Sequence, residues 1–406
     1  MLGRLAKNLH EVSNTAIELV RFRYPTFVYG REIQRGEIPV FCFHGAEPDS
    51  FEKYAQFLTE NRYTTLSVSE FYDIVTRRLE PPERPVLLTF DDGWGSVWGC
   101  AFPVLRDYGL KATVFLVSSL VRSSTEYRAN LDDVKRGTAS LVDIAQRDHS
   151  EYPFLTTQEI QSMAQSGVID FESHTHVHSM LPVSDRIVDF YRPYVQTRFH
   201  PWLIPLVNNG GLDLPLEQIR FGTPIYESAP VSAGRPRYFE DSGLRDACVR
   251  RVESEGGSRF FEQTGWKNEL LRVVRDWKRA GGVPGRFETS DETRESLRSG
   301  FQLSKQTIET VLPHRKITHL CYPWGVGSQL AVKVSQEVGF QTNFWIDAEH
   351  KRIPRIGTDP YKVGRLTSDF FFTLPGSKRK SLLDVVRHKL RRRLRQGSVF
   401  LAYQSN

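Results

Sequence analysis

The run Val86–Phe90, followed by Asp91, Asp92 and Gly93, constrains the fold more than any other stretch of the chain. An uninterrupted apolar run opened by Pro85 is typical of a buried strand in a parallel sheet. The two carboxylates follow at its carboxyl end, where α/β folds place their chemistry. Neighbouring strand residues point to opposite faces, so a turn at Gly93 is needed to bring both acids into one pocket. The alternative is a helix N-cap followed by a first-turn acid.

A second stretch places three histidines within five residues. Val168–Phe171 is a predicted short strand, and His174, His176 and His178 follow it. Imidazoles spaced in this way are more often metal ligands than isolated histidines are. His174 and His178, four residues apart, converge on one face if the segment turns helically. One carboxylate from the first stretch would complete a site of two histidines and one acid, with open positions for water and substrate.

Taken together, the two stretches resemble a known family. Thr89–Gly93 followed by the pattern from His174 to His178 is similar to the first two motifs of the polysaccharide deacetylases, the NodB-homology group of carbohydrate esterases. The resemblance covers roughly residues 38–180 and 300–367. It implies an α/β fold, a distorted (β/α)7-type barrel. It also implies a metal-dependent hydrolase that removes an N-acetyl group from an amino sugar of a polysaccharide or oligosaccharide.

The resemblance assigns a role to each matching side chain. Asp91 would be the general base, while Asp92, His174 and His178 would bind one divalent metal. The intervening His176 matches no family ligand. Nitrogen and oxygen donors of this kind suit Zn²⁺ best, and Co²⁺, Ni²⁺ or Fe²⁺ are also compatible. A serine triad is excluded because the chain has no nucleophile elbow.

Two further segments resemble family features. A strand over residues 38–43 ends in His44, as in the circularly permuted poly-N-acetylglucosamine deacetylases, which makes His44 the candidate general acid. The alternative is a buried or substrate-lining histidine. Tyr322, Pro323 and Trp324 are similar to the third family motif, which lines the pocket. The resemblance implies that the backbone N–H of Trp324 donates to the oxyanion.

The third motif departs from the family at one position. Cys321 stands where the usual form has an arginine that orients the base. Arg365 lies in the predicted late strand 361–366 and could reach the carboxylate of Asp91 instead. The alternative for Arg365 is an ordinary surface arginine.

The chain divides into three predicted parts. Residues 1–37 hold an amphipathic helix and a lead-in, 38–375 form the barrel, and 376–406 form a basic tail. Residues 180–300 are a long insertion after the metal histidines, which either walls the cleft or mediates oligomerisation. Residues 121–154 are polar and are predicted to form a surface excursion. Helices are predicted over 51–58, 96–108, 270–278 and 304–312.

Charge and cysteine content suggest partners and compartment. The net charge of +6 favours an anionic neighbour, but the aromatic-and-basic signature of nucleic-acid binding is missing. Lys378–Arg395 carries nine basic residues, which fits either peripheral contact with an anionic membrane or a solvated charge run. The four cysteines lack C-x-x-C spacing, so we expect free thiols. With no signal-peptide or transmembrane pattern, the sequence predicts a cytoplasmic protein.

Two other functions fit the same residues. One is deacetylation or deformylation of a lipid-linked sugar at the inner membrane face, which the basic tail favours. The other is a catalytically inactive sugar-binding relative, which the intact set of Asp91, Asp92, His174 and His178 argues against. Fold alone does not decide between them. The sequence makes no prediction of oligomeric state.

Overall fold

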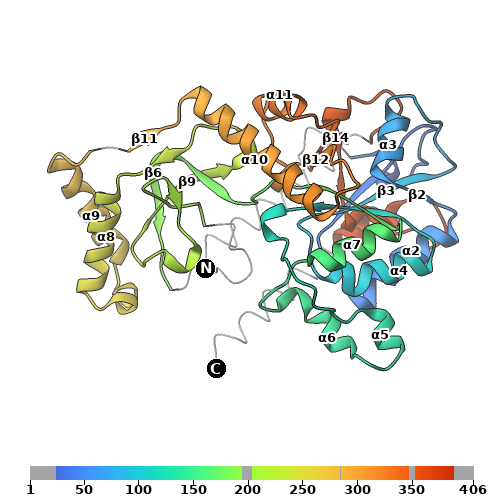
Figure 1. Ribbon diagram of the computed structural model, residues 1–406, viewed down its shortest axis with the longest axis horizontal. Helices are drawn as coiled ribbons and strands as arrows, with labels where there is room; N and C mark the ends of the chain where they lie inside the picture. Colours follow the sequence, from blue (N-terminus) through green and yellow to red (C-terminus); the bar gives the residue numbers. More distant parts are fainter. Residues whose placement is uncertain (1–23, 194–203, 284, 347–352, 388–406) are drawn as a thin grey trace. The chain divides into compact units, whose positions relative to one another are not determined.

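The computed structural model describes residues 24–193, 204–283, 285–346 and 353–387 (Figure 1). The chain forms two compact units. The first comprises residues 1–176, 303–325 and 339–406, and the second comprises 177–302 and 326–338. The predicted amphipathic helix of the first twenty residues, and the basic tail beyond residue 387, lie outside the described residues. The domain boundaries drawn from the sequence stay a prediction.

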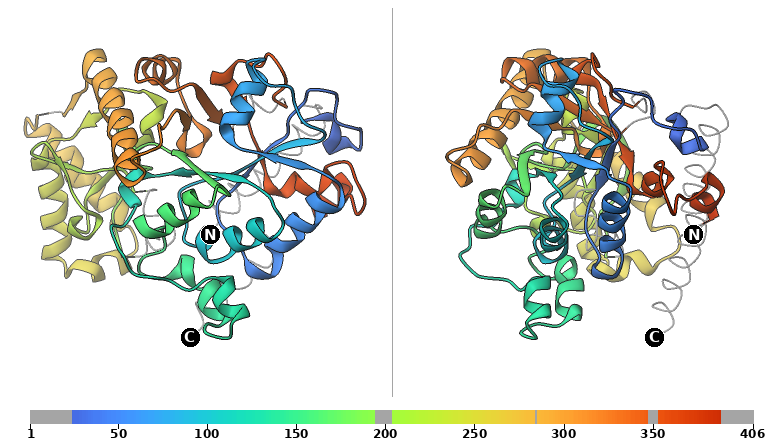
Figure 2. Two further views of the ribbon diagram at one scale, coloured as in Figure 1. Left: turned by 45° about the vertical axis from the view of Figure 1, so that its right-hand side comes forward. Right: turned by 90° about the vertical axis from the view of Figure 1, so that its right-hand side faces the viewer.

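The first unit is built on a parallel sheet. Its order along the hydrogen-bonded path is β14-β13-β12-β5-β4-β3-β1-β15, and β2 pairs with the first half of β3. Figure 2 shows these strands crossing the middle of the unit, with helices on both sides of them. The strands are β1 (Val40–Phe43), β2 (Thr64–Leu66), β3 (Pro85–Phe90), β4 (Ala112–Leu116), β5 (Ile169–Ser173), β12 (His319–Cys321), β13 (Thr342–Trp345), β14 (Val363–Gly364) and β15 (Leu366–Thr367).

One extended segment closes this sheet into a barrel. β14 and β15 are separated only by Arg365, so the two ends of the strand path belong to the same stretch of chain. Val363 pairs with Phe344 of β13, and Leu366 pairs with Phe41 of β1. With β14 and β15 counted as one strand, seven parallel strands of the described residues complete the circle. The predicted distorted (β/α)7-type barrel is confirmed.

The helices of the first unit follow the strands as βα units require. Capping boxes at Ser67 and Thr156 start α3 and α7. The predicted helix 96–108 begins as a π-helical turn, η2, before α4. The elements are α2 (Pro48–Glu60), α3 (Val68–Val75), η2 (Val97–Ala101), α4 (Phe102–Asp107), α5 (Leu131–Lys135), α6 (Leu141–Ala145) and α7 (Thr157–Gln165).

Two sequence predictions for this region are confirmed in part. The helix expected over 304–312 is the end of α10 (Ser290–Val311), which runs from the second unit into the first. It starts early because Thr289 and Glu292 cap each other's backbone N–H groups. Residues 121–154 are also more than a surface excursion. Pro153, at the end of this segment, accepts a backbone hydrogen bond from Gly95 in the loop after β3.

The second unit is built from short antiparallel pairs. β6 (Met180–Phe190) pairs with β9 (Pro224–Pro230), with irregular register within β6. Two smaller pairs are β7 (Asn208–Asn209) with β8 (Leu212–Asp213), and β10 (Tyr238–Phe239) with β11 (Arg286–Phe287). Helices α8 (Ser242–Ser254) and α9 (Trp266–Arg279) share an apolar core with the end of β6. The predicted helix 270–278 is confirmed and is longer than expected. α11 (Gln329–Glu337) completes the unit.

The thiol prediction is confirmed, because Cys42, Cys100, Cys248 and Cys321 are all free and buried. Residues 382–387 of the basic segment are helical, and Val385 is the buried residue among them. Within the described ranges, no helix combines the length and the apolar character that crossing a membrane requires.

Candidate active site

The two acids after β3 reach one pocket through a tight turn. The N–H of Asp91 donates to the carbonyl of Phe43 at 2.9 Å, so the ladder with β1 continues one residue past β3. Asp92 then adopts the left-handed conformation, with φ of 71°, and Gly93 N–H donates back to Asp91 O at 2.9 Å. Aspartate tolerates this conformation better than most residues. Both carboxylates are about 3% exposed, at the carboxyl end of the barrel strands.

Asp91 is paired with Arg365 from the closing segment. The two guanidinium nitrogens donate to the two carboxylate oxygens at 2.7 Å each, in a bidentate pair. Arg365 also donates to Thr89 Oγ1 at 3.0 Å and is buried. Burial alone would raise the pKa of Asp91, but the charge of Arg365 outweighs it and holds that pKa well below its usual range. The predicted contact between Arg365 and Asp91 is present.

Two thiols complete the surroundings of Asp91. Cys42 Sγ lies 3.3 Å from Asp91 Oδ2, and Cys321 Sγ lies 3.8 Å from Oδ1. Burial raises the pKa of both thiols, so they stay protonated and act as weak donors. Sequence reasoning did not anticipate Cys42. The available signal was its position two residues before His44 on a strand with an inward face.

Asp92, His174 and His178 form a candidate metal centre. One ligand atom from each lies within 4.8 Å of the other two, and all three residues are buried. His174 Nε2 lies 3.5 Å from Asp92 Oδ1. The first segment of the first unit ends at His176, and His178 follows that boundary by two positions. Mixed imidazole and carboxylate donors at this separation are the donor set that zinc-type metals take, so the residues fit such a metal.

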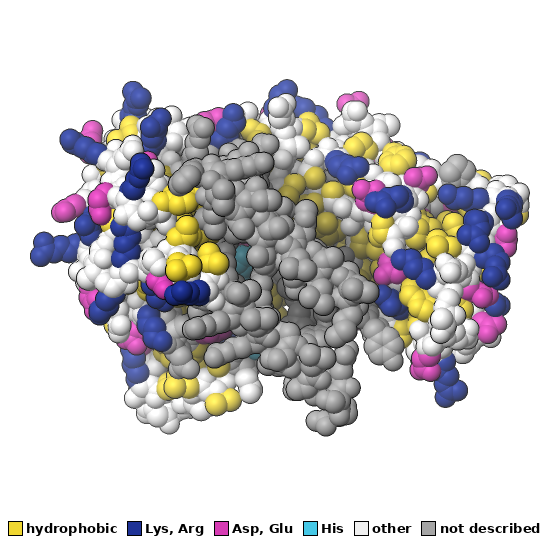
Figure 3. Space-filling view, turned by 180° about the vertical axis from the view of Figure 1, so that it is seen from behind, with side chains coloured by type: hydrophobic (Ala, Val, Ile, Leu, Met, Phe, Trp, Pro, Cys, Tyr) yellow, Lys and Arg dark blue, Asp and Glu magenta, His cyan; other side chains and the backbone are white. Residues whose placement is uncertain are grey.

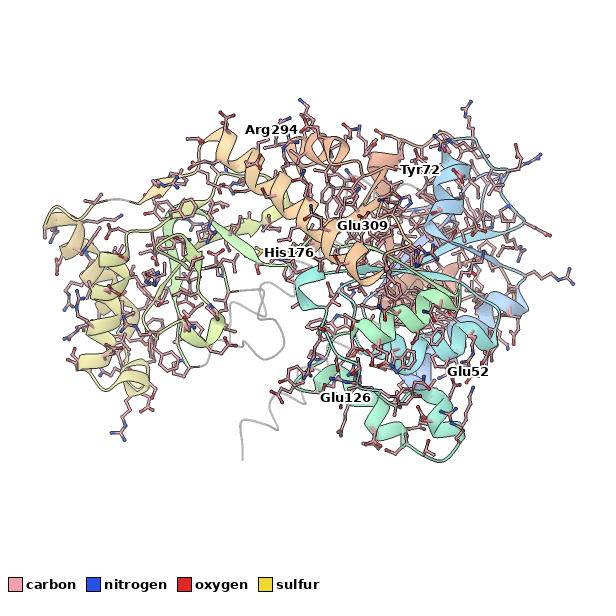
Figure 4. The ribbon with its side chains drawn as sticks, in the orientation of Figure 1. Glu52, Tyr72, Glu126, His176, Arg294 and Glu309 are labelled. Carbon is pink, nitrogen blue, oxygen red and sulfur yellow. The ribbon has the colours of Figure 1, made fainter. Side chains whose placement is uncertain are left out.

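The environment of His174 prepares it as a ligand. Burial lowers its pKa to about 4, so the ring is neutral near pH 7. Its Nδ1 lies 2.9 Å from the carbonyl oxygen of Cys321, which assigns the ring proton to Nδ1 and leaves the Nε2 lone pair for a metal. His176 instead places Nδ1 2.9 Å from Ser118 Oγ. Figure 4 shows His176 where the chain leaves the barrel sheet, and no metal-type cluster of the described residues includes it.

The remaining predicted residues differ in their burial. His44 is exposed at the end of β1, and one of its ring nitrogens lies within 4.8 Å of ligand atoms of Asp91 and Cys42. The side chain of Tyr322 is fully buried, and its hydroxyl accepts from Asn343 Nδ2 at 2.8 Å. Pro323 is buried, whereas Trp324 is 39% exposed.

All three motifs share one backbone feature. Asp92, Thr175 and Trp324 have φ of 71°, 67° and 60°, and they are three of the seven described non-glycine residues with positive φ. Such conformations cost energy and cluster at functional sites, where the surrounding structure enforces them. Each motif thus uses one left-handed residue to turn the chain at the end of its strand.

The segment Pro153–Leu155 braces the loop that carries the acids. Leu155 N–H donates to Gly93 O at 2.9 Å, and Gly95 N–H donates to Pro153 O at 2.6 Å. The rings of Trp94 and Phe154 pack with centroids 4.7 Å apart. This contact was missing from the sequence prediction, which treated the end of 121–154 as surface.

A second brace joins the loops after β1 and β3. Ala46 N–H donates to Ser96 Oγ at 3.0 Å, and Ser96 N–H donates to Asp148 Oδ1 at 2.8 Å. A side chain at Gly45 would meet Asp148 Oδ2 at 2.9 Å, so the loop after His44 passes close to this carboxylate. The position of His44 relative to Asp91 therefore depends on residues from three separate segments.

Comparison with known proteins agrees with this geometry. Residues 78–194, which hold both acids and all three clustered histidines, match the family model described as polysaccharide deacetylase. The part of the chain that carries both motifs is thus similar to the polysaccharide deacetylases. The chain is 27% identical over 171 residues to YxkH of Bacillus subtilis strain 168, whose name describes it as a polysaccharide deacetylase. That match covers 40% of this chain and 51% of YxkH.

Further similarities lie within the same family. The chain is 28% identical over 126 residues to a poly-beta-1,6-N-acetyl-D-glucosamine N-deacetylase of Staphylococcus epidermidis, covering 31% of this chain and 35% of that protein. The chain thus spans about half of the length of one of these relatives and about a third of the other. The deacetylase domain of BpsB from Bordetella bronchiseptica aligns over 83% of this chain and 98% of its own, with 17% identity and a TM-score of 0.48.

Proposed function

We propose that the protein is a metal-dependent amide hydrolase that removes an N-acetyl group from an amino sugar in a polysaccharide or oligosaccharide. The observation that carries this proposal is the buried set of Asp92, His174 and His178 beside the Asp91–Arg365 pair at one end of the barrel. The relatives include a poly-beta-1,6-N-acetyl-D-glucosamine N-deacetylase, which supports the choice of substrate class.

Each residue has a step to perform in such a hydrolysis. A divalent metal held by Asp92, His174 and His178 would polarise the amide carbonyl and lower the pKa of water. Asp91 accepts the proton of the attacking water, and its pairing with Arg365 keeps it ionised for that purpose. His44, exposed beside Asp91, delivers a proton to the departing amine nitrogen. The backbone N–H of Trp324 donates to the oxyanion.

The finer assignments belong to the same proposal. We expect Zn²⁺ because the donors are two imidazoles and one carboxylate. The four buried free thiols favour a reducing compartment such as the cytoplasm. Basic side chains of Lys378–Arg395 would contact an anionic membrane. On the face seen in Figure 3, Lys and Arg are interspersed with Asp and Glu on each unit, so this face is not a broad basic surface.

The decisive experiment measures metal and turnover on the same sample. The purified chain is loaded with Zn²⁺, and amine release is followed on N-acetylglucosamine oligomers. We expect one bound metal per chain and release of acetate and free amine in equal amounts. Oligomer binding without amine release would indicate a sugar-binding relative. Release only from lipid-linked substrates would assign the alternative substrate.

His44→Ala should retain the metal and lose turnover, and normal turnover would remove His44 from the mechanism.

A further inference from the structure

The indole of Trp94 lies against one of the predicted metal ligands. Its Nε1–H donates to Asp92 Oδ2 at 3.0 Å. The other carboxylate oxygen, Oδ1, is the one that lies 3.5 Å from His174 Nε2. The two oxygens therefore face different groups. A carboxylate oriented in this way offers a single oxygen to the position between the two histidines.

We propose that Trp94 is a positioning residue for the metal, because its indole N–H fixes the orientation in which Asp92 presents Oδ1. The inference rests on the proposed function in one respect, namely that Asp92, His174 and His178 bind a metal. It adds a residue that matches none of the motif positions carried over from the family.

The contrast between the two neighbouring acids supports this role. Asp91 is bound by the full positive charge of Arg365, which would repel a cation placed on the same carboxylate. Asp92 is bound by a neutral N–H donor, which orients the carboxylate and leaves its charge for the metal. The chemistry of the two partners thus separates a proton acceptor from a metal ligand within one dipeptide.

Trp94 is itself held in place from the other side. The backbone of Trp94 forms an isolated antiparallel bridge with Phe154, and the two rings pack at 4.7 Å. Hydrogen bonds from Leu155 to Gly93 and from Gly95 to Pro153 flank this bridge. The direction of the indole N–H is therefore fixed by the segment 153–155 and does not depend on Asp92 alone.

The test compares Trp94→Phe with Trp98→Phe. Trp94→Phe keeps a ring against Phe154 and removes only the donor. Trp98→Phe is the matched control, because its indole donates to the backbone carbonyl of Arg128 at 2.7 Å and it is buried. The dissociation constant for Zn²⁺ is measured by competition with a chromogenic chelator, and the Co²⁺ form is compared by its visible absorption spectrum. We expect Trp94→Phe to weaken Zn²⁺ binding ~10–100-fold and to change the Co²⁺ spectrum. Trp98→Phe should do neither.

The outcomes separate this inference from the proposed function. Equal Zn²⁺ affinity of wild type and Trp94→Phe, both folded by melting of the metal-free proteins, would overturn the role of Trp94. No Zn²⁺ binding by the wild type would instead overturn the proposed function. If Trp94→Phe does not fold, Phe154→Leu takes its place, since it loosens the indole without touching Asp92. A loss of affinity smaller than tenfold, in the same direction, supports the inference, and unchanged affinity overturns it.

Discussion

The barrel and the second unit bury ion pairs in different ways. In the barrel, Asp91 and Arg365 are 274 residues apart in sequence and meet only because the last strand closes the sheet. In the second unit, the buried Glu240 accepts from Arg245, five residues away, at 3.0 Å. The first pair stands among two thiols and three histidines, whereas the second holds Asn208 and Asn209 of a short hairpin. A buried pair indicates a site when long-range packing gathers other reactive groups around it.

The largest effect should follow from breaking the metal set in the barrel. His178→Ala removes one of three predicted ligands, so we expect loss of stoichiometric metal and of nearly all amine release. The barrel should stay folded, because the residue lies beyond the strands. Metal analysis and circular dichroism of the purified variant check this. Full metal occupancy in His178→Ala would exclude His178 as a ligand.

Asp91→Asn should separate catalysis from metal binding. The amide keeps the shape of the side chain but cannot accept the proton of water, so turnover should fall ~10²–10⁴-fold. Metal content should stay near that of the wild type, because Asp92 remains. Asp92→Asn is the control with the opposite pattern, since it should lose metal and recover part of its activity in excess Zn²⁺. Loss of metal in Asp91→Asn with retention in Asp92→Asn would reverse the two roles.

Arg365→Met should raise the pKa of Asp91 and make the rate depend on its protonation. In the wild type, the guanidinium holds the pKa of Asp91 low, so Asp91 stays ionised and gives no acid limb between about pH 5 and 8. Without that charge, burial raises the pKa, and the rate should fall as the pH drops through this range. The profile of kcat/KM against pH for both proteins measures the change. Superimposable profiles would show that Arg365 does not act through Asp91.

Arg245→Ala should affect the stability of the second unit and leave the metal content unchanged. Removing one partner of a buried pair costs about 3–5 kcal/mol, because Glu240 is left as an unpaired charge. Burial raises the pKa of Glu240 to about 7 in the wild type. Because this pKa is raised above that of the unfolded chain, the contribution of Glu240 to the free energy of unfolding falls as the pH rises from about 4.5 to about 7. The cost should therefore be larger at pH 8 than at pH 5, where Glu240 takes up a proton. Urea melts at both pH values test this, and a pH-independent cost would contradict it.

The sequence predicted the parts of the site that lie close together along the chain. The run before Asp91 and the histidine spacing are local patterns, and the predictions of the barrel and of the metal ligands depended on them. Arg365 could only be offered as a candidate, because its contact with Asp91 depends on barrel closure. The contacts of Cys42 with Asp91, and of Phe154 with Trp94, left no local pattern. The second unit was not predicted beyond one helix, since its strands are short and irregularly paired.

The closing segment also has a consequence for biosynthesis. Both acids and the clustered histidines leave the ribosome long before residues 363–367, because synthesis proceeds from the N-terminus. Until those residues arrive, the sheet has an open seam between β13 and β1, and Asp91 lacks its guanidinium partner. Contacts this distant in sequence also form slowly during folding. A growing chain that already contains both motifs therefore lacks the completed site, which assembles only when the last strand joins the first.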